Sequence, residues 1–316
     1  MKKRPLGRSG IEIPPLVFGG NVFGWTVDAR GAHALLDRLA DAGLNAIDTA
    51  DVYSAWVSGN EGGESETIIG NWLAGAPGRR AATIIVTKVG SAIGAHPKGL
   101  SAQRIAIGVE DSLRRLRTDY IDVYLSHWPD PQTPIDETLR AYESLLQQGK
   151  VRAIGCSNYD AGQLREALTT AARENLPAYQ VLQPEYNLYD RGGFEGELRD
   201  VCIEAGLGVI TYFSLAAGFL SGKYRSKEDL AGRARAGMVG KYLDERGLRI
   251  LAALDRVAAA HRAQPAEVAL AWLMTRPGVT APIASATTPA QLDSLIRATR
   301  LSLSQADLDL LDAASA

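Results

Sequence analysis

The segment Ala42-Gly43-Leu44-Asn45-Ala46-Ile47 joins a predicted helix to a predicted strand, and similar junctions recur along the chain. Residues 205–210 are Ala-Gly-Leu-Gly-Val-Ile, and residues 148–154 are Gln-Gly-Lys-Val-Arg-Ala-Ile. In each junction the glycine is suited to end a helix, because glycine adopts left-handed backbone angles at little cost. The apolar residues that follow it predict a strand. The repeated unit is therefore a helix, a glycine and a strand.

Short apolar runs predict the strands of the fold. They are continuously apolar rather than alternating, which is typical of parallel strands covered on both faces. The runs lie at residues 16–18, 46–47, 84–86, 121–125, 153–154, 181–182, 209–210 and 281–283. Helical patterns separate them, so the sequence predicts an α/β protein with a (β/α)8 TIM barrel as a single domain over residues 1–316. An open doubly wound sheet is the alternative, but the Gly-x-Gly-x-x-Gly turn expected after its first strand is absent.

Capping residues mark several of the predicted helices, and further segments predict additions to the barrel. Asp28 and Asp160 are predicted N-caps, and Thr133 is the predicted N-cap of a helix that runs to Gly149. Residues 5–14 predict an N-terminal β-hairpin that closes the bottom of the barrel. Residues 216–243 predict a long loop after strand seven, which we expect to be functional. Extra C-terminal helices are predicted at 244–263, 265–276 and 303–313.

The composition excludes several classes of function. The 316 residues include 34 basic and 36 acidic ones, and no basic face predicts a nucleic-acid or membrane partner. No apolar run approaches the ~20 residues that cross a bilayer. The two cysteines, Cys156 and Cys202, predict no disulfide framework and favour a reducing compartment. Because an apolar leader is also missing, we expect a cytoplasmic protein.

Polar residues follow the predicted strands, and the C-terminal ends of barrel strands carry the chemistry of such folds. They are Asp48, Lys88, His127, Ser157, Asn158, Gln183, Glu185 and Tyr212 to Ser214. Each alone has a structural explanation, such as capping a turn or filling the core. Their joint position at one end of the barrel predicts a shared site.

Several motifs follow one another along the chain. They are residues 48–53 (Asp-Thr-Ala-Asp-Val-Tyr), 64–66 (Glu-Ser-Glu), 87–90 (Thr-Lys-Val-Gly), 126–130 (Ser-His-Trp-Pro-Asp), 155–158 (Gly-Cys-Ser-Asn), 183–187 (Gln-Pro-Glu-Tyr-Asn) and 218–224 (Gly-Phe-Leu-Ser-Gly-Lys-Tyr). With these motifs the chain resembles the aldo-keto reductase family over essentially its whole length. The resemblance implies a barrel that binds NADP(H) without a Rossmann fold.

The resemblance implies that Asp48, Tyr53, Lys88 and His127 are the catalytic residues. Reduction of a carbonyl needs a hydride at its carbon and a proton at its oxygen. A phenol with a pKa near 10 can donate that proton but is a reluctant acid at neutral pH. We therefore expect the Lys88 ammonium to lower the pKa of Tyr53, and Asp48 to hold Lys88 charged. His127 is expected to orient the substrate oxygen.

The resemblance also assigns the contacts of the cofactor. Ser157, Asn158 and Gln183 are expected to hold the nicotinamide carboxamide, and Tyr212 to stack on the nicotinamide ring. The other expected cofactor contacts are Asp48, Phe213, Ser214, Leu215, Gly218, Gly222, Lys223, Arg233, Ser285, Thr287 and Gln291. The segment from Gly218 to Lys223 is one residue too short for a P-loop and is followed by Tyr224, so a nucleoside triphosphate site is rejected.

The adenosine end departs from the family pattern. The basic residue often found near Thr287 is absent, and Leu295 stands where an asparagine commonly contacts adenine. A 2′-phosphate favours Arg or Lys, which Arg233 or Arg235 from the long loop is expected to supply. NADP(H) is the favoured cofactor, and NAD(H) is the alternative.

The expected substrate is a small carbonyl compound. Trp25, Trp56 and Trp128 lie in loops after strands one, two and four, where aromatic residues commonly line a pocket with Tyr53 and His127. The other histidines show no metal-ligand spacing, so no metal site is expected. The resemblance implies that the protein is a monomer that reduces aldehyde, ketone or sugar carbonyls. The alternatives are oxidation of a sugar, and a nucleotide-binding regulatory subunit of a channel without turnover.

Overall fold

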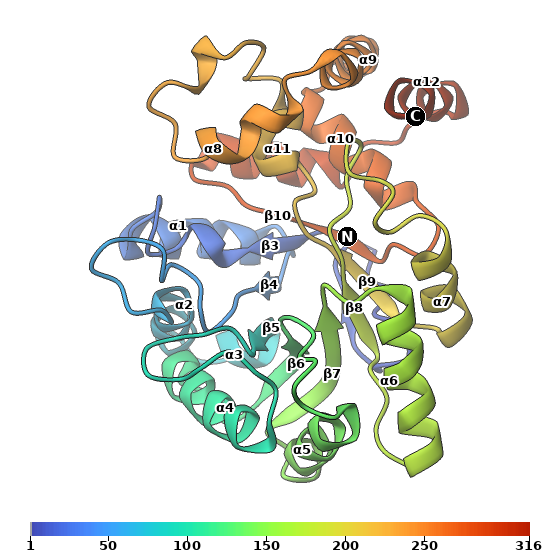
Figure 1. The fold of residues 1–316 in the computed structure, drawn as a ribbon. Helices are drawn as coiled ribbons and strands as arrows, with labels where there is room; N and C mark the ends of the chain where they lie inside the picture. Colours follow the sequence, from blue (N-terminus) through green and yellow to red (C-terminus); the bar gives the residue numbers. More distant parts are fainter. Residues whose placement is uncertain (1) are drawn as a thin grey trace.

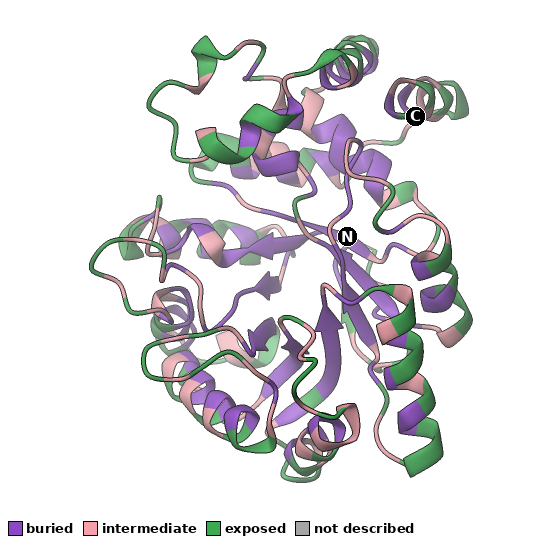
Figure 2. Cartoon of the chain, in the orientation of Figure 1, coloured by how far each residue is buried: buried purple, intermediate pink, exposed green. Residues whose placement is uncertain are grey.

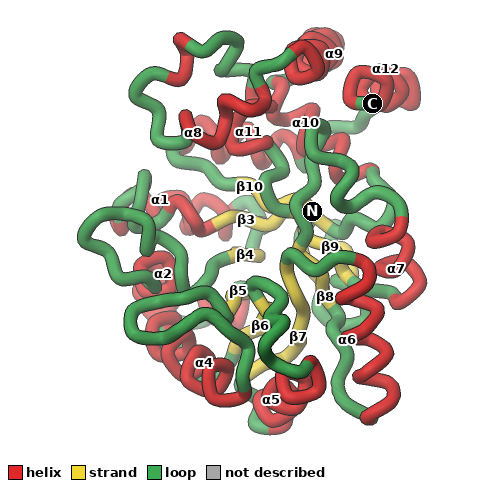
Figure 3. Tube along the Cα trace, in the orientation of Figure 1, coloured by secondary structure: helices red, strands yellow, loops and turns green. Residues whose placement is uncertain are grey.

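Eight parallel strands close into a barrel in which the first strand pairs with the last. The computed structural model describes residues 2–316. The strands are β3 (Val17–Gly19), β4 (Ala46–Asp48), β5 (Ile84–Val89), β6 (Ile121–Ser126), β7 (Val151–Ser157), β8 (Val181–Gln183), β9 (Gly208–Thr211) and β10 (Ala281–Ala284). They follow one another around the ring in chain order. Figure 3 shows them at the centre, surrounded by helices. The predicted barrel and all eight of its strands are confirmed.

The helices lie outside the strands, as Figure 1 shows. They are α1 (Ala29–Asp41), α2 (Glu64–Ala74), α3 (Arg79–Ala82), α4 (Ala102–Leu116), α5 (Ile135–Gln147), α6 (Ala161–Glu174), α7 (Glu197–Ala205), α8 (Ala236–Val239), α9 (Glu245–His261), α10 (Pro265–Thr275), α11 (Pro289–Ala298) and α12 (Gln305–Ser315). Asp28 and Asp160 cap α1 and α6 as predicted, accepting from the backbone N–H of Gly31 and Gln163. Between residues 2 and 316, no helix combines the length and the apolar character needed to cross a lipid bilayer.

Three expectations about the elements need correction. Thr133 does not cap α5, because its hydroxyl donates to Asp130 and Pro134 takes the N-cap position. That helix ends at Gln147, just before the left-handed Gly149 that was expected to close it. The segment 216–243 is not a plain loop: it contains α8 and the 3-10 turns η2 (Ala216–Ser221), η3 (Glu228–Leu230) and η4 (Gly240–Tyr242).

The apolar core has two parts. One lies inside the barrel and consists of inward-facing strand residues such as Ala46, Val86 and Val123. Leu6 and Ile13 belong to this part because the hairpin of β1 (Arg4–Pro5) and β2 (Glu12–Ile13) closes the bottom of the barrel. The other part fills the space between the strands and the helices. Figure 2 shows strands that are buried almost throughout and helices that expose their outer faces.

The alternation of side chains along the strands explains why four polar residues lie at the mouth of the barrel. Successive side chains of a strand point to opposite faces, so every second residue faces the barrel interior. Ala46, Val86, Leu125 and Val181 belong to the inner core. The residues two positions after them are Asp48, Lys88, His127 and Gln183. The same alternation that fills the barrel therefore brings these four polar side chains to its C-terminal mouth.

Candidate active site

Lys88 lies at the centre of the polar cluster in the barrel mouth. Its side chain is buried, and its ammonium group forms three hydrogen bonds. Nζ donates over 2.9 Å to Asp48 Oδ2, over 2.8 Å to the Thr49 carbonyl oxygen and over 2.8 Å to Tyr53 Oη. All three ammonium protons therefore have an acceptor, and the buried charge has a carboxylate partner.

Asp48 connects Lys88 to the other polar groups of the mouth. Its Oδ2 accepts a hydrogen bond of 3.1 Å from the Tyr53 hydroxyl, and its Oδ1 accepts one of 2.8 Å from Gln183 Nε2. Asp48 and Gln183 are both buried. The structure thus brings Asp48, Tyr53 and Lys88 into one hydrogen-bonded group, as the sequence predicts.

Burial shifts the pKa values of two side chains in this hydrogen-bonded group, Lys88 and Tyr53. Burial lowers the pKa of Lys88, and the Asp48 carboxylate opposes this effect. Burial and the same carboxylate raise the pKa of Tyr53 well above its ordinary value. Burial and the Asp48 carboxylate therefore outweigh any lowering of the Tyr53 pKa by Lys88 in this state, and the expectation that Lys88 lowers it stays a prediction. Tyr53 is fully protonated at neutral pH, which keeps a proton available for donation.

His127 completes the cluster from the end of β6. Burial and the nearby Lys88 ammonium lower its pKa from 6.5 to about 3. Its ring centroid is 6.2 Å from that of Tyr53 in an edge-on contact, and it stacks on Trp128 at 5.9 Å. The imidazole is therefore neutral and held beside the phenol.

Three aromatic side chains extend the cluster toward solvent. The rings of Trp25 and Trp56 meet edge to face at 5.8 Å, and Trp56 lies 6.1 Å from Tyr53. Trp56 and Trp128 expose 51% and 42% of their surface. Exposed tryptophans on both sides of Tyr53 and His127 are available to contact a ligand, so their role in substrate binding stays a prediction.

Amide and hydroxyl groups at the ends of β7, β8 and β9 adjoin the cluster. Ser157 Oγ donates to the Gln183 carbonyl, and Asn158 Nδ2 donates to Ser157 Oγ and to the His127 carbonyl. The Tyr212 hydroxyl donates to Asn158 Oδ1 over 2.6 Å. These four residues form one network, which places the expected nicotinamide contacts beside Asp48.

The segment that follows β9 has an unusual backbone. Phe213, Ala216, Ala217 and Gly218 have φ angles of 50°, 48°, 56° and 99°. Non-glycine residues rarely occupy this left-handed region, and where they do so together the strain commonly marks a functional site. Ser214 is buried, Leu215 is partly buried, and Gly222 ends η2 with a φ of 77°. The Lys223 ammonium lies over the Tyr224 ring at 4.9 Å.

The residues expected at the adenosine end are more scattered. Thr287 donates through its backbone N–H and its hydroxyl to Gln291 Oε1, and Ser285 donates to Asn21. Leu295 packs in the core with 3% exposure and offers no polar contact. Arg233 is exposed, whereas the Arg235 guanidinium lies 5.4 Å above the Trp25 ring. Neither arginine forms a side-chain hydrogen bond with residues 2–316.

Some contacts of the site were missed at the sequence level. The Thr49 carbonyl binds Lys88, and Ser91 Oγ lies 3.2 Å from His127 Nδ1. Arg104 joins Asp51 to the Ser91 carbonyl with bonds of 2.8 and 3.1 Å. The position of Ser91 directly after Lys88-Val89-Gly90 is the one signal that could have indicated it.

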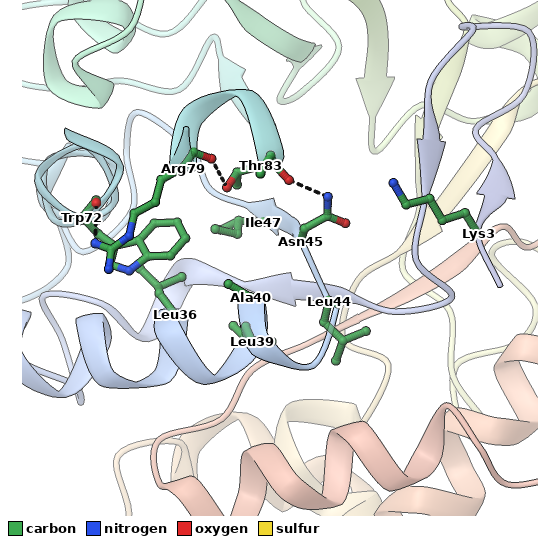
Figure 4. Close-up of a pocket in the computed structure, with 12 residues that line it drawn as sticks. Lys3, Leu36, Leu39, Ala40, Leu44, Asn45, Ile47, Trp72, Arg79 and Thr83 are labelled. Atoms are coloured by element: carbon green, nitrogen blue, oxygen red, sulfur yellow. Dashed lines mark hydrogen bonds between the residues drawn. The ribbon is translucent and has the colours of Figure 1, made fainter. Parts of the chain in front are cut away.

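A cavity of about 330 Å³ opens at the opposite end of the barrel from this cluster. Figure 4 shows Leu36, Leu39, Ile47 and Trp72 on its walls, with Lys3 at its edge. Arg79 is already paired with Asp37 at 2.6 Å. This cavity lies at the N-terminal ends of β4 and β5, where barrels carry stabilising contacts rather than chemistry.

Over residues 2–316, no group of three or more His, Cys, Asp or Glu side chains could hold a metal ion.

Comparison with known proteins agrees with this geometry. The profile of the Aldo/keto reductase family matches residues 15–316. A protein of rice named as a probable voltage-gated potassium channel subunit beta is 34% identical over 92% of this chain and 89% of its own length. An Arabidopsis thaliana protein with the same description is 33% identical, covering 94% of this chain and 91% of its own length. An uncharacterized oxidoreductase of Bacillus subtilis, YrpG, is 33% identical over 97% of this chain and 94% of its own length. The chain therefore belongs to the aldo/keto reductase family.

Proposed function

We propose that this protein is an NADP(H)-dependent oxidoreductase that reduces aldehyde, ketone or sugar carbonyls to alcohols, with Tyr53 as the general acid. The observation that carries the proposal is the contact between Tyr53 Oη and Lys88 Nζ at 2.8 Å, beside the neutral His127. A phenol, an ammonium group and an imidazole that converge at one point can bind and protonate a carbonyl oxygen.

Each side chain has a distinct task in this reaction. When bound, the reduced nicotinamide supplies the hydride that the carbonyl carbon accepts. The Tyr53 O–H, which bonds Asp48 in this state, turns its proton to the carbonyl oxygen. The Lys88 ammonium donates to Tyr53 Oη and so stabilises the negative charge that develops on the phenol. His127 donates a hydrogen bond to the same substrate oxygen and orients the carbonyl.

The residues of the mouth fit a nicotinamide cofactor. A carboxamide offers N–H donors and a carbonyl acceptor. Gln183 Oε1 has no hydrogen-bond partner within residues 2–316, although Nε2 of the same amide is bound to Asp48. It is therefore a free acceptor for a carboxamide N–H, whereas the Asn158 amide and Ser157 hydroxyl protons already donate to other groups of the mouth. The left-handed residues Phe213, Ala216, Ala217 and Gly218 lie among residues of ordinary φ, a backbone arrangement that favours an anion where its N–H groups are unbonded; the Ala216 and Gly218 N–H groups already donate to the Phe213 and Leu215 carbonyls.

Replacement of the acid tests the proposal directly. Tyr53→Phe keeps the ring but removes the proton, so we expect kcat for NADPH-dependent aldehyde reduction to fall about 10²- to 10⁴-fold. Binding of NADPH, measured by fluorescence titration, should stay unchanged. The matched control is Tyr120→Phe, because the Tyr120 hydroxyl forms no hydrogen bond with residues 2–316 and the residue precedes β6 at the other end of the barrel. Full activity of Tyr53→Phe would show that another group is the acid.

The preference for NADP(H) is tested at the two loop arginines. If Arg233 or Arg235 binds the 2′-phosphate, its replacement by Ala should weaken NADPH binding by about tenfold and leave NADH binding unchanged, because NADH lacks that phosphate. Titration of both cofactors against both variants measures this. Equal losses for NADPH and NADH would contradict a role in recognition of the phosphate.

A regulatory role is the second candidate. Two of the relatives are named as probable channel subunits, which supports a nucleotide-binding protein that modulates a partner. The complete set of Asp48, Tyr53, Lys88 and His127 favours turnover. Assays in both directions, on aldehydes and free aldoses with NADPH and on sugars with NADP+, separate the possibilities. Tight NADPH binding without turnover on any carbonyl would favour the regulatory role.

A further inference from the structure

Ser91 is a contact of the site to which the proposed mechanism assigns no task. It lies two residues beyond the end of β5, and its hydroxyl oxygen is 3.2 Å from His127 Nδ1. His127 Nε2, by contrast, forms no hydrogen bond with residues 2–316. One ring nitrogen is therefore occupied by Ser91, and the other is available to a substrate.

Because His127 is neutral, the ring nitrogen that carries its single proton decides whether the ring can donate a hydrogen bond to a substrate. A neutral imidazole has one N–H donor and one bare acceptor nitrogen. To donate to a carbonyl oxygen, His127 must carry its proton on Nε2, so that Nδ1 is an acceptor. A hydroxyl at Nδ1 can then donate to it. The identity of the group at the second nitrogen commonly sets the tautomer of a histidine.

The backbone around Ser91 is fixed by a buried ion pair. The Ser91 carbonyl accepts a hydrogen bond of 3.1 Å from Arg104 Nη2, and the same nitrogen donates to Asp51 Oδ2 over 2.8 Å. Arg104 is 6% exposed and Asp51 is 1% exposed. Asp51 precedes Tyr53 by two residues, so one guanidinium group holds both the Tyr53 loop and the Ser91 loop. The hydroxyl therefore approaches His127 from a rigid support.

We propose that Ser91 is a positioning residue for His127: its hydroxyl donates to Nδ1 and holds the neutral ring in the tautomer that carries its proton on Nε2. Trp128 and Tyr53 restrict the plane of the ring by stacking and edge contacts. Within residues 2–316 neither of them forms a hydrogen bond with a ring nitrogen of His127, and Ser91 supplies the selection between the two nitrogens. The effect on catalysis rests on the proposed function, whereas the tautomer itself does not.

Nitrogen-15 NMR of the histidine-labelled full chain tests the tautomer without any activity assay. The His127 signals are assigned by their loss in His127→Gln. At pH 7 we expect Nδ1 to resonate as an unprotonated, pyridine-type nitrogen and Nε2 as a protonated one. In Ser91→Ala the two signals should move toward each other as the tautomers mix. Ser91→Thr, which keeps the hydroxyl, should restore the original spectrum. A protonated Nδ1 in the unaltered protein, or an unchanged spectrum in Ser91→Ala, would overturn the proposal.

Kinetics then connects the tautomer to the reaction. Ser91→Ala should lower kcat for carbonyl reduction about tenfold, equivalent to one hydrogen bond of about 1.4 kcal/mol. The affinity for NADPH should not change, and Ser91→Thr should recover most of the rate. The exposed Ser302, replaced by Ala, is the control. A tautomer change without loss of kcat would refute the catalytic consequence. If the unaltered protein reduces no carbonyl, the proposed function fails, and the NMR result still decides the role of Ser91.

Discussion

At the scale of single residues, the site combines a buried cation with a phenol that keeps its proton. Lys88 donates to Tyr53 Oη, yet burial and Asp48 together raise the pKa of Tyr53. The ammonium group therefore acts when charge develops on the phenol oxygen, not by ionising Tyr53 beforehand. The sequence predicts which residues meet, but the balance between burial and charge depends on distances that only the folded chain defines.

His127 leads to a prediction about pH. Its pKa of about 3 lies far below the ordinary 6.5, so the folded protein keeps the ring neutral across pH 5–8. We expect no inflection of kcat/KM near pH 6.5 that depends on this residue. Measurement of kcat/KM against pH for the unaltered protein and for His127→Gln checks this. An inflection near 6.5 that disappears in the variant would contradict it.

The same pKa shift has a consequence for stability. The unfolded chain binds a proton at His127 near pH 6.5, whereas the folded protein binds it only near pH 3. Above pH 6.5 His127 is neutral in both the folded and the unfolded chain, so proton binding at this residue does not favour unfolding, and its contribution to the free energy of unfolding is complete. That contribution is lost as the pH falls from 6.5 toward 3.

At the scale of the elements, the strands were predictable and the loops were not. Continuous apolar runs fixed the place of all eight barrel strands, because strands covered on both faces need such residues. The left-handed backbone at Ala216 and Ala217 had no signal, since alanine does not favour those angles. The contacts of Ser91 and Arg104 were likewise hidden, because Ser91 lies in a loop without a periodic pattern and the helical pattern of α4 does not show which distant groups Arg104 reaches.

Gly155 in β7 gives a prediction at this scale. A Cβ atom at this position would lie 2.3 Å from the Val181 carbonyl oxygen and 2.7 Å from Leu125 Cδ2. The first contact is with backbone of the neighbouring strand, which cannot move without breaking the β7–β8 pairing. We expect Gly155→Ala to lower the free energy of unfolding by about 3 kcal/mol, at the upper end for an overpacked core. Urea denaturation measures this.

The matched control is Gly192→Ala, where a Cβ atom would meet nothing within 4 Å. Its stability should stay within about 0.5 kcal/mol of the unaltered protein. If both variants unfold at the same urea concentration, the close approach at Gly155 is not a constraint on the fold.

At the scale of the whole molecule, the two ends of the barrel have separate tasks. The proposed chemistry lies at the C-terminal ends of the strands, and the hairpin with Leu6 and Ile13 closes the opposite end. This division was predictable, because it follows from the parallel direction of all the strands. The contacts of Arg233 and Arg235 were not predictable, since they depend on the path of the segment that follows η2.

The separation predicts that stability and activity can be changed independently. Leu6 is fully buried among the inner core residues, so Leu6→Ala should cost about 2–5 kcal/mol of the free energy of unfolding. At temperatures where the variant is folded, KM and kcat should match those of the unaltered protein. Urea denaturation and steady-state kinetics on the same sample test both parts. A large change in KM would show that the hairpin end influences the mouth.

The closure of the ring by β3 and β10 also bears on how the chain is made. The Arg4 guanidinium donates to the carbonyls of Met274 and Thr280, and β3 pairs with β10. A ribosome releases the N-terminal segment long before these partners exist. Until about residue 284 emerges, the outer edge of β3 has no strand beside it and is open to pairing with other chains. Nascent chains that stop short of β10 should therefore bind holdase chaperones, and completion of that last strand should release them.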